Sequence, residues 1–376
     1  MKKKVVIIGC GYAGAVTAWR LSSFRDKISV TIIDKGGSFN CLPLMPDCIG
    51  RGILTSKLYF PIGSLAKKYG CQFIQEEVIS LDLENKIAHC AHINLNYDYL
   101  VIATGTETNF YGNNKIRDYA YKLDSPADAQ KILDGLWAQD FQNFVISGAG
   151  YTGIEVATNL KLHLQKRKIS KPVIILERAS SILGPLPEWM KDYVASNLKI
   201  MSIEIRCGVF IENIEGEDLV LSDKTILKES LLIWAAGVKT PQYLQTLNIP
   251  KNPQGRIMVD NYLEFREGCF AAGDSACFSQ GKSFLRMAVQ FAIAQGHTVA
   301  LNIARSLENK PKAVFKPRDW GYIIPMANNF ACGIVLGRKV KGRKAIFLHY
   351  LLCLWRTVGW GNKLSVFRSL ILNSRQ

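Results

Sequence analysis

The sequence lacks any C-x-x-C pair, although ten of its 376 residues are cysteines. The most closely spaced cysteines are Cys41 with Cys48 and Cys269 with Cys277, and neither spacing suits a zinc ribbon. We therefore predict no metal site. We also expect reduced, mostly buried cysteines of the kind found in cytoplasmic proteins.

Long apolar runs are also absent, and no stretch approaches the ~20 residues of a membrane-spanning helix. The start of the chain, Met1 to Lys4 followed by the apolar Val5–Ile8, imitates a secretory signal. Its apolar part has only four residues, whereas the core of such a signal needs roughly seven to fifteen. Val5–Ile8 therefore predicts a first buried β-strand.

Acidic residues are nearly absent from the C-terminal segment, residues 316–376. It contains eleven lysines and arginines and one acidic residue, Asp319, so it contributes +10 of the net charge of +16. A basic block of this kind is typical of a solvated tail, a nucleic-acid-binding patch or a membrane-binding surface. No nucleic-acid-binding motif accompanies the charge, so we predict that nucleic acid is not a partner.

Short apolar segments alternate with helical ones along the rest of the chain. Val5–Ile8, Tyr99–Ala103, Phe144–Ser147 and Val173–Leu176 are brief and largely apolar, as expected of buried parallel strands. Helical segments such as Gly153–Lys166 stand between them. The alternation predicts an α/β fold with doubly wound parallel sheets.

The first strand runs into a glycine-rich turn, GCGYAG, which begins at Gly9. In this G-x-G-x-x-G pattern Gly9 permits a tight turn, Gly11 lets a pyrophosphate approach the backbone, and Gly14 lets helix and strand pack closely. Asp34 lies twenty residues past Gly14 at the end of the second strand, with Lys35 directly after it. A carboxylate there can accept the ribose hydroxyls, so we predict a dinucleotide site.

The same pattern returns as GAGYTG, which begins at Gly148 and continues with Gly150 and Gly153. Glu177 lies twenty-four residues beyond the last of these glycines, again at a strand end. An acid there favours NADH because it repels the 2′-phosphate of NADPH, although the adjacent Arg178 could weaken that preference. Two dinucleotide sites on one chain imply electron transfer between them.

Two further elements carry a family resemblance. Ala103, Thr104 and Gly105 are similar to the A-T-G element near the flavin in the two-dinucleotide flavoprotein reductases, the pyridine nucleotide-disulfide oxidoreductase superfamily. The stretch FAAGD, which ends in Gly273 and Asp274, is similar to the second FAD signature of that superfamily, whose aspartate binds the ribityl chain. The resemblance implies FAD at the first glycine turn, contacted by these five residues, and NADH at the second.

Two further similarities extend these sites. Val78, in the pair Glu77-Val78, is similar to a stretch that contacts adenine. Gly237, within the sequence WAAGV, resembles a strand end beside the nicotinamide. The resemblance therefore adds Val78 and Gly237 to the cofactor-binding residues.

Three features resemble one branch in particular, the membrane-bound type II NADH:quinone oxidoreductases. The loop FNCLPLMPD at residues 39–47 is similar to the F-x-P-L-L-P-E loop of that branch, and TGIE, which ends at Glu155, matches its T-G-x-E. The helix AVQFAIAQG, with Gln290 and Gln295, is similar to A-Q-x-A-x-Q-Q-G, although Ala294 replaces a glutamine. The resemblance implies that Glu155, Gln290 and Gln295 are catalytic.

These assignments predict two Rossmann-like dinucleotide-binding domains, one inserted in the other, plus a C-terminal membrane-interface helical segment. The FAD-binding domain comprises residues 1–112 and 247–315. The NADH-binding domain comprises residues 113–246, and the C-terminal segment comprises residues 316–376.

The C-terminal segment predicts two amphipathic helices. Ala345–Trp355 is apolar apart from His349, and after Gly359 a second helix gathers its large apolar residues on one face. With Trp355, Trp360 and many cationic side chains, the pattern is typical of helices that lie in a membrane interface. The same apolar face would also suit a homodimer interface.

The sequence therefore predicts an FAD-dependent NADH dehydrogenase of the respiratory chain that passes electrons to a membrane quinone without pumping protons. We expect a peripheral, monotopic protein on the cytoplasmic face of the inner (plasma) membrane. A sulfide:quinone oxidoreductase stays open, although Cys332 has no obvious partner for the cysteine pair that such an enzyme needs. A coenzyme A-disulfide or thiol reductase using Cys41 and a non-catalytic flavin-based redox sensor also stay open.

Overall fold

The computed structural model describes residues 1–281 and 283–374, and the chain forms two compact units of three segments each. The segments of unit 1 are Met1–Phe39, Phe60–Glu107 and Val238–Asp319. The segments of unit 2 are Asn40–Tyr59, Thr108–Gly237 and Trp320–Gln376. Short strands mark four of the places where the chain passes between the units: β3 (Ser38–Asn40), β4 (Tyr59–Pro61), β10 (Glu107–Thr108) and β18 (Val238–Lys239).

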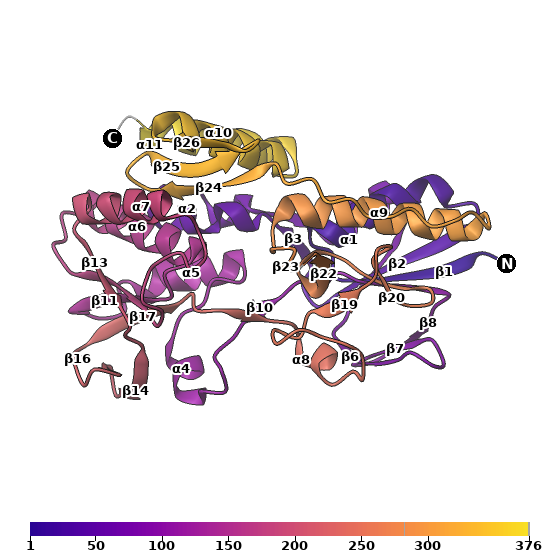
Figure 1. Cartoon of the computed structure of the whole chain (residues 1–376), viewed down its shortest axis with the longest axis horizontal. Coiled ribbons are helices and arrows are strands. Elements are labelled where there is room, and N and C mark those ends of the chain that lie inside the picture. Colours follow the sequence, from indigo (N-terminus) through magenta and orange to yellow (C-terminus); the bar gives the residue numbers. More distant parts are fainter. Residues whose placement is uncertain (282, 375–376) are drawn as a thin grey trace. The chain divides into compact units, whose positions relative to one another are not determined.

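A six-stranded sheet forms the centre of unit 1 (Figure 1). Its strands, in spatial order, are β20 (Glu264–Arg266), β21 (Cys269–Ala271), β9 (Tyr99–Ile102), β1 (Lys3–Ile8), β2 (Ile28–Asp34) and β5 (Gln72–Gln75). Neighbours pair in parallel except β20 and β21. The strand order reverses at β1, which lies between β2 and β9. In such sheets the carboxyl ends of the strands at the reversal form the usual ligand-binding edge.

Successive residues of β1 face opposite layers because side chains alternate along a strand. Val5 and Ile7 pack with helices α1 (Tyr12–Leu21), α3 (Ile62–Tyr69) and α9 (Val289–Leu307). Val6 and Ile8 pack on the other face with an antiparallel sheet of β6 (Val78–Asp82), β7 (Ile87–Cys90) and β8 (Asn94–Asn96). The other elements of unit 1 are α8 (Gln242–Gln245), β19 (Ile257–Val259), β22 (Ala276–Gln280) and β23 (Ser283–Phe284).

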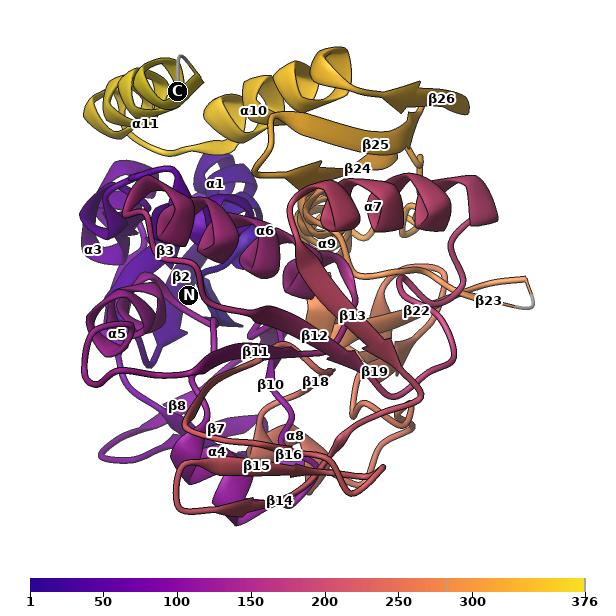
Figure 2. The ribbon, with the colours of Figure 1, turned by 90° about the vertical axis from the view of Figure 1, so that its left-hand side faces the viewer.

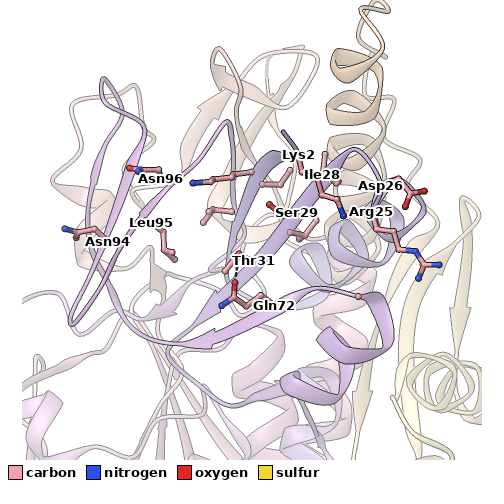
Figure 3. Close-up of a pocket in the computed structure, with 15 residues that line it drawn as sticks. Lys2, Arg25, Asp26, Ile28, Ser29, Thr31, Gln72, Asn94, Leu95 and Asn96 are labelled. Carbon is pink, nitrogen blue, oxygen red and sulfur yellow. Dashed lines mark hydrogen bonds between the residues drawn. The ribbon is translucent and has the colours of Figure 1, made fainter.

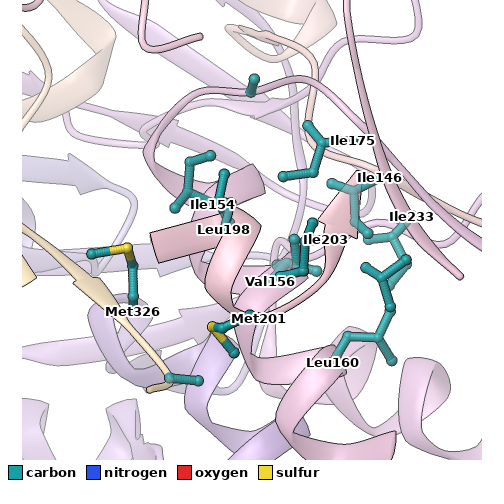
Figure 4. Close-up of a cluster of buried hydrophobic side chains, with 14 of the residues drawn as sticks. Ile146, Ile154, Val156, Leu160, Ile175, Leu198, Met201, Ile203, Ile233 and Met326 are labelled. Atoms are coloured by element: carbon teal, nitrogen blue, oxygen red, sulfur yellow. The ribbon is translucent and has the colours of Figure 1, made fainter. Parts of the chain in front are cut away.

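A four-stranded parallel sheet forms the centre of unit 2 (Figure 2). Its strands, in spatial order, are β13 (Ile203–Cys207), β12 (Val173–Glu177), β11 (Asn143–Ser147) and β17 (Ser230–Trp234). One face is covered by α5 (Pro126–Gly135), α6 (Tyr151–Lys166) and α7 (Glu188–Ile200), whose apolar residues fill the core shown in Figure 4. The other face packs with α4 (Asn114–Tyr119), β14 (Ile211–Glu215), β15 (Asp218–Leu221) and β16 (Ile226–Leu227).

Two parts of unit 2 come from outside this Rossmann-like sequence. Helix α2 (Met45–Gly50) packs against α6, and a Cβ added to Gly50 would lie 2.3 Å from the carbonyl oxygen of Asn159. Residues 320–376 form an antiparallel sheet followed by two helices. These elements are β24 (Gly321–Met326), β25 (Phe330–Val335), β26 (Arg338–Lys341), α10 (Arg343–Arg356) and α11 (Trp360–Ser374).

The C-terminal region contains the two helices that the sequence predicts, but the sheet before them is an addition to the prediction. Met326 at the end of β24 and Cys332 in β25 are buried in the same core as Ile146 and Leu160. Within the described part of the chain, no helix has the length and apolar character needed to cross a membrane.

Candidate cofactor-binding sites

The first glycine turn joins β1 to α1, and the steric constraint on the residue differs among its three glycine positions. Gly9 has φ +93°, a conformation that favours glycine. A Cβ added to Gly14 would lie 2.0 Å from the carbonyl oxygen of Gly9, so only glycine lets the helix start this close to the turn. Beside Gly11, by contrast, no atom of the described residues lies within 4 Å of the Cβ that a larger residue would add.

The carboxylate of Asp34 is hydrogen-bonded to the first glycine turn. It accepts hydrogen bonds from the backbone N–H of Cys10 (2.7 Å) and of Gly36 (2.8 Å). Burial raises the pKa of Asp34, and these hydrogen bonds and nearby Lys35 oppose that shift. Lys35 itself is exposed, with its ammonium 3.9 Å from Glu107.

Two elements far apart in the sequence lie beside this turn. The backbone N–H of Gly105 donates to the hydroxyl of Ser275 (2.8 Å), and the N–H of Ala272 donates to the carbonyl of Ile102 (2.9 Å). A Cβ added to Gly9 would lie 2.5 Å from the carbonyl oxygen of Ala103. The predicted FAD residues Ala103, Thr104, Gly105, Gly273 and Asp274 are therefore brought to the carboxyl ends of β1, β9 and β21.

The remaining predicted residues of unit 1 have defined contacts. Gln295 is buried, and its carbonyl oxygen accepts a hydrogen bond from the N–H of Gly273 (2.7 Å), so it positions the FAD-signature turn. Gln290 is half-buried and donates to Asp319 (3.1 Å). Val78 is buried at the start of β6. The segment just before β6 lies beside Asp34, because the N–H of Glu76 donates to the Asp34 carbonyl (3.2 Å).

A polar groove of about 570 Å³ lies elsewhere on unit 1 (Figure 3). It is lined by Ser29 and Thr31 of β2, Gln72 of β5, and Asn94 and Asn96 of β8, among others. The residues that β1 and β2 contribute to it lie in the amino-terminal parts of those strands, whereas the glycine turn follows the carboxyl end of β1. Because nucleotides bind at carboxyl ends, we do not place a cofactor in this groove.

The second glycine turn joins β11 to α6 and repeats the geometry of the first. Gly148 has φ +103°, and a Cβ added to Gly153 would lie 1.9 Å from the carbonyl oxygen of Gly148. Again no described atom lies within 4 Å of a Cβ added to Gly150. The carboxylate of Glu177 accepts from the N–H of Ala149 (2.7 Å) and of Ala179 (2.9 Å).

Two residues frame the second turn. Gly237 has φ +85°, and an added Cβ would lie 2.1 Å from the hydroxyl of Tyr111, so a larger residue would collide there. Arg178 is exposed and stacks on Phe210, with its guanidinium carbon 5.0 Å from the ring centroid. The guanidinium of Arg178, next to Glu177, therefore contacts the Phe210 ring on one side and remains exposed to solvent.

Both turns fit a dinucleotide. In each, the first and third glycines are required by the backbone around them, whereas the second glycine leaves open space. That space adjoins a helix N-terminus, where backbone N–H groups and the helix dipole favour a phosphate. The acid at the end of the neighbouring strand accepts a hydrogen bond from the same turn and retains acceptor capacity for ribose hydroxyls.

A polar cluster of unit 2 comprises the buried Asp47, Arg51 and Asn159 and the half-buried Tyr350. It adjoins the backbone of Glu155. Asp47 accepts a hydrogen bond from the Tyr350 hydroxyl (2.8 Å), and Arg51 Nε lies 3.2 Å from the same oxygen. Asn159 reaches Asp47 at 3.5 Å and also donates to the backbone carbonyl of Glu155 (3.0 Å). Glu155 is half-buried, and its pKa is raised well above the usual value by burial and then by Asp47.

Comparison with known proteins identifies the family. The model of the pyridine nucleotide-disulphide oxidoreductases matches residues 3–296, most of the chain. The chain belongs to this family. A "Type II NADH:quinone oxidoreductase" from Staphylococcus haemolyticus is 26% identical over 378 residues, which cover 92% of this chain and 93% of that protein.

Solved structures share the fold. NDH2 from Plasmodium falciparum in complex with NADH aligns with a TM-score of 0.85 at 18% identity, over 99% of this chain and 98% of that one. The sulfide:quinone oxidoreductase from Aquifex aeolicus aligns with a TM-score of 0.79 at 19% identity, over 96% and 92%. The predicted α/β fold with two Rossmann-like parts and C-terminal helices is confirmed, as is the predicted superfamily.

Several residues of this family member were not among the sequence-based candidates. Ser275 binds the A-T-G element, Asp319 binds Gln290, and Arg51 and Tyr350 complete the polar cluster. Asp47 is the last residue of the loop FNCLPLMPD that the sequence analysis singled out, and Arg51 follows it by four residues. That i, i+4 spacing of opposite charges was the available signal for their pairing.

Proposed function

We propose that the chain is a type II NADH:quinone oxidoreductase, which transfers a hydride from NADH to FAD and passes the electrons to a membrane quinone without pumping protons. The observation that carries the proposal is the pair of glycine turns, each with open space beside its second glycine and an acid at the strand end. Bound FAD supplies a redox centre that accepts a hydride from one partner and gives electrons to another.

In this proposal unit 1 holds FAD. Gly9, Gly11, Gly14 and Asp34 hold the pyrophosphate and the adenosine ribose, with Lys35 and Val78 beside the adenosine. Ala103, Thr104, Gly105, Gly273 and Asp274 hold the rest of the cofactor. The buried amide of Gln295 keeps the N–H of Gly273 in position, so its part in binding is indirect. The FAD-binding domain that we propose, residues 1–112 and 247–315, overlaps unit 1 but has different bounds, because residues 40–59 belong to unit 2 and residues 238–246 to unit 1.

Unit 2 holds NADH through Gly148, Gly150 and Gly153, with Glu177 on the ribose and Gly237 near the nicotinamide; residues 113–246 would form this domain. Glu155 lies two residues beyond Gly153, just after the first turn of α6, and is the carboxyl group that we place in the active site. Burial and then Asp47 raise the pKa of Glu155 well above its usual value, which favours the protonated form that a proton donor to the reduced quinone needs. Gln290, paired with Asp319, is proposed to face the quinone.

The C-terminal helices are proposed to lie on the cytoplasmic face of the plasma membrane. Phe347 and Trp355 of α10 are 72% and 69% exposed, and Trp360 and Leu372 of α11 are 88% and 69% exposed. The ammonium of Lys363 lies 5.7 Å from the ring centroid of Trp360. Exposed aromatic and apolar side chains next to cations suit the interface between headgroups and acyl chains.

The alternative of a thiol-dependent reductase has less support in the structure. Cys41 and Cys332 are both buried, and burial raises the pKa of Cys332 to about 12. A thiol with such a high pKa is a poor nucleophile, because the thiolate is the reactive form.

Purified protein reconstituted in vesicles would test the proposal. We expect rapid NADH oxidation with a short-chain quinone, slower oxidation of NADPH, and no turnover of sulfide or coenzyme A disulfide. Oxidation of sulfide, or disulfide turnover without quinone reduction, would contradict it. Omitting the vesicles separates catalysis from membrane binding, since a short-chain quinone remains accessible in solution.

A further inference from the structure

The segment that leads from α2 into β4 packs against both C-terminal helices of unit 2. Ile53 and Leu58 of this segment are buried in one hydrophobic core. The same core contains Cys353 of α10 and Val366 of α11. The short 3₁₀ turn Thr55–Lys57, which lies between the two buried residues, also contacts α11. The C-terminal helices and this early segment therefore form one packed structure, although they are far apart in the sequence.

The residue that follows each of these buried side chains is exposed. Leu54 is 57% exposed and Tyr59 is 43% exposed. The side-chain amide of Asn362, in the first turn of α11, donates to the carbonyl of Tyr59 (3.0 Å). The same turn carries Trp360, which is 88% exposed. Leu54 and Tyr59 therefore border the exposed apolar surface of α11.

The early segment and the C-terminal segment also share a charge pattern. Residues 320–376 contain no acidic residue, and the single one in residues 40–59 is Asp47, which is 3% exposed. Cations are present in both segments, with Lys57 in the first and Lys363 in α11. Among the described residues, neither segment therefore exposes an acidic side chain beside its apolar ones.

This combination favours a bilayer that contains anionic lipids over a second copy of the chain. A two-fold dimer places the same surface on both subunits, so it would bring the cations of these segments together without an exposed acid from either segment. Anionic headgroups, by contrast, attract lysine and arginine side chains. Leucine, tyrosine and tryptophan side chains suit the boundary between headgroups and acyl chains.

We propose that the early segment is a second membrane-contacting element: Leu54 and Tyr59 enter an anionic bilayer beside α11, and Lys57 contacts the headgroups. The inference extends the membrane-binding part of the proposed function and rests on it. Residues 320–376 then provide only part of the binding surface, and the core that contains Ile53 and Leu58 holds the two parts together.

Hydrogen exchange of the full FAD-containing chain tests this placement without any substitution. Vesicles of phosphatidylglycerol and phosphatidylcholine in equal parts should slow exchange of the backbone amides of residues 52–60 and of α11. Exchange in β15 and β16 should stay unchanged, because these strands pack on the opposite face of the four-stranded sheet. Unchanged exchange in residues 52–60 would overturn the inference. Protection that rises with protein concentration in the absence of vesicles would also overturn it, since that indicates self-association.

Substitutions measure the contribution of each side chain. Leu54→Ser and Tyr59→Ser should each weaken binding to these vesicles about fivefold in co-sedimentation, because each removes apolar area that the bilayer would bury. Lys57→Gln should weaken binding to the same vesicles about fivefold and leave binding to phosphatidylcholine vesicles unchanged. Ile226→Ser is the matched control, since Ile226 of β16 is 52% exposed but lies on the opposite face of the sheet.

The outcomes separate this inference from the proposed function. Wild-type binding by both Leu54→Ser and Tyr59→Ser, or an equal loss in Ile226→Ser, would overturn the inference. If the wild-type chain reduces a short-chain quinone with NADH but binds no vesicles, the inference fails and the catalytic proposal stands. If the chain binds vesicles through residues 52–60 but does not reduce quinone, the inference stands and the proposed function fails.

Discussion

The two glycine turns of this chain are built alike, but the helices that begin at them differ at an equivalent position. Both turns have a first glycine with φ near +100°, a third glycine in contact with the carbonyl of the first, and a second glycine beside open space. Two residues after the third glycine, however, unit 1 has Val16 and unit 2 has Glu155. Val16 is half-buried and lies beside Gly296 of α9, so unit 1 uses this position for packing between helices.

The same position in unit 2 carries a half-buried carboxyl group whose pKa is raised by burial and by Asp47. A carboxyl in such surroundings costs stability unless something compensates for it. The comparison teaches that one scaffold can use an equivalent helix position for packing or for chemistry. The difference from Val16 is consistent with the active-site role that we propose for Glu155.

The largest effect should come from filling the open space beside the second glycine of either turn. Gly11→Val should yield colourless protein, whereas Gly150→Val should stay yellow and lose roughly 100-fold in NADH oxidation, as expected when charge-assisted backbone bonds to a pyrophosphate are blocked. Flavin absorbance and steady-state rates measure the two losses. Because nothing described lies near either added Cβ, circular dichroism should remain that of the wild type. Retention of FAD by Gly11→Val would break the comparison.

A smaller loss of activity is expected from substitutions at the equivalent helix positions, Glu155 in α6 and Val16 in α1, and it should occur only at Glu155. Glu155→Gln should slow reoxidation of the flavin by quinone roughly 100-fold, because a group that can hold and release a proton is lost. Val16→Ala should leave that rate near the wild-type value and cost about 1 kcal/mol of unfolding free energy through lost packing. Stopped-flow measurement of both half-reactions and a denaturant titration test the pair. Equal kinetic losses in both variants would show that the position has no special role in unit 2.

The two acids should differ in what they select. Glu177→Ala should reduce the preference for NADH over NADPH about tenfold, since it removes both a hydrogen-bond acceptor and the charge that repels a 2′-phosphate. Asp34→Ala should weaken FAD retention and leave the nucleotide preference unchanged. The ratio of kcat/KM for the two nucleotides decides the matter, and an unchanged ratio in Glu177→Ala would contradict the assignment.

The smallest effects should come from the basic residues that come directly after the acids. Lys35 is exposed and 3.9 Å from Glu107, and Arg178 is exposed over Phe210. Exposed contacts of these kinds contribute about 0–1 kcal/mol. Lys35→Ala and Arg178→Ala should therefore change cofactor affinities by no more than about threefold, measured by flavin titration and by KM for NADH. A tenfold change would mean that either residue binds phosphate directly.

Much of the fold could be predicted because its signals are local. A glycine turn, the strand before it, the helix after it and the acid about twenty residues later stand close together in sequence, and each has a steric reason. The sheet of residues 321–341 was missed although β24 (GYIIPM) and β25 (FACGIV) are largely apolar, because β26 (RKVK) is short and basic and the whole stretch lies in a segment that was interpreted by its charge. Its burial depends on Met326 and Cys332 reaching the core of a distant segment.

The candidate site divides in the same way. Gly11, Gly150, Asp34 and Glu177 are predicted by motif spacing, but the structure gives Gln295 a supporting contact with Gly273 that spacing could not show. The cluster around Asp47 joins positions about 300 residues apart, Asp47 and Tyr350, so no local pattern contains it. The carboxylate of Asp47 and the hydroxyl of Tyr350 come together only through tertiary packing.

The route of residues 320–376 through unit 2 has a practical consequence for anyone shortening this protein. Met326 and Cys332 fill the same interior as Ile146 and Leu160, and Arg51 is anchored by the carbonyls of Met326 and Ala327. A chain truncated after Asp319 would therefore lose part of the hydrophobic core of unit 2 as well as the C-terminal helices. Versions meant to avoid detergent should keep the whole chain and replace exposed side chains such as Phe347 and Trp360.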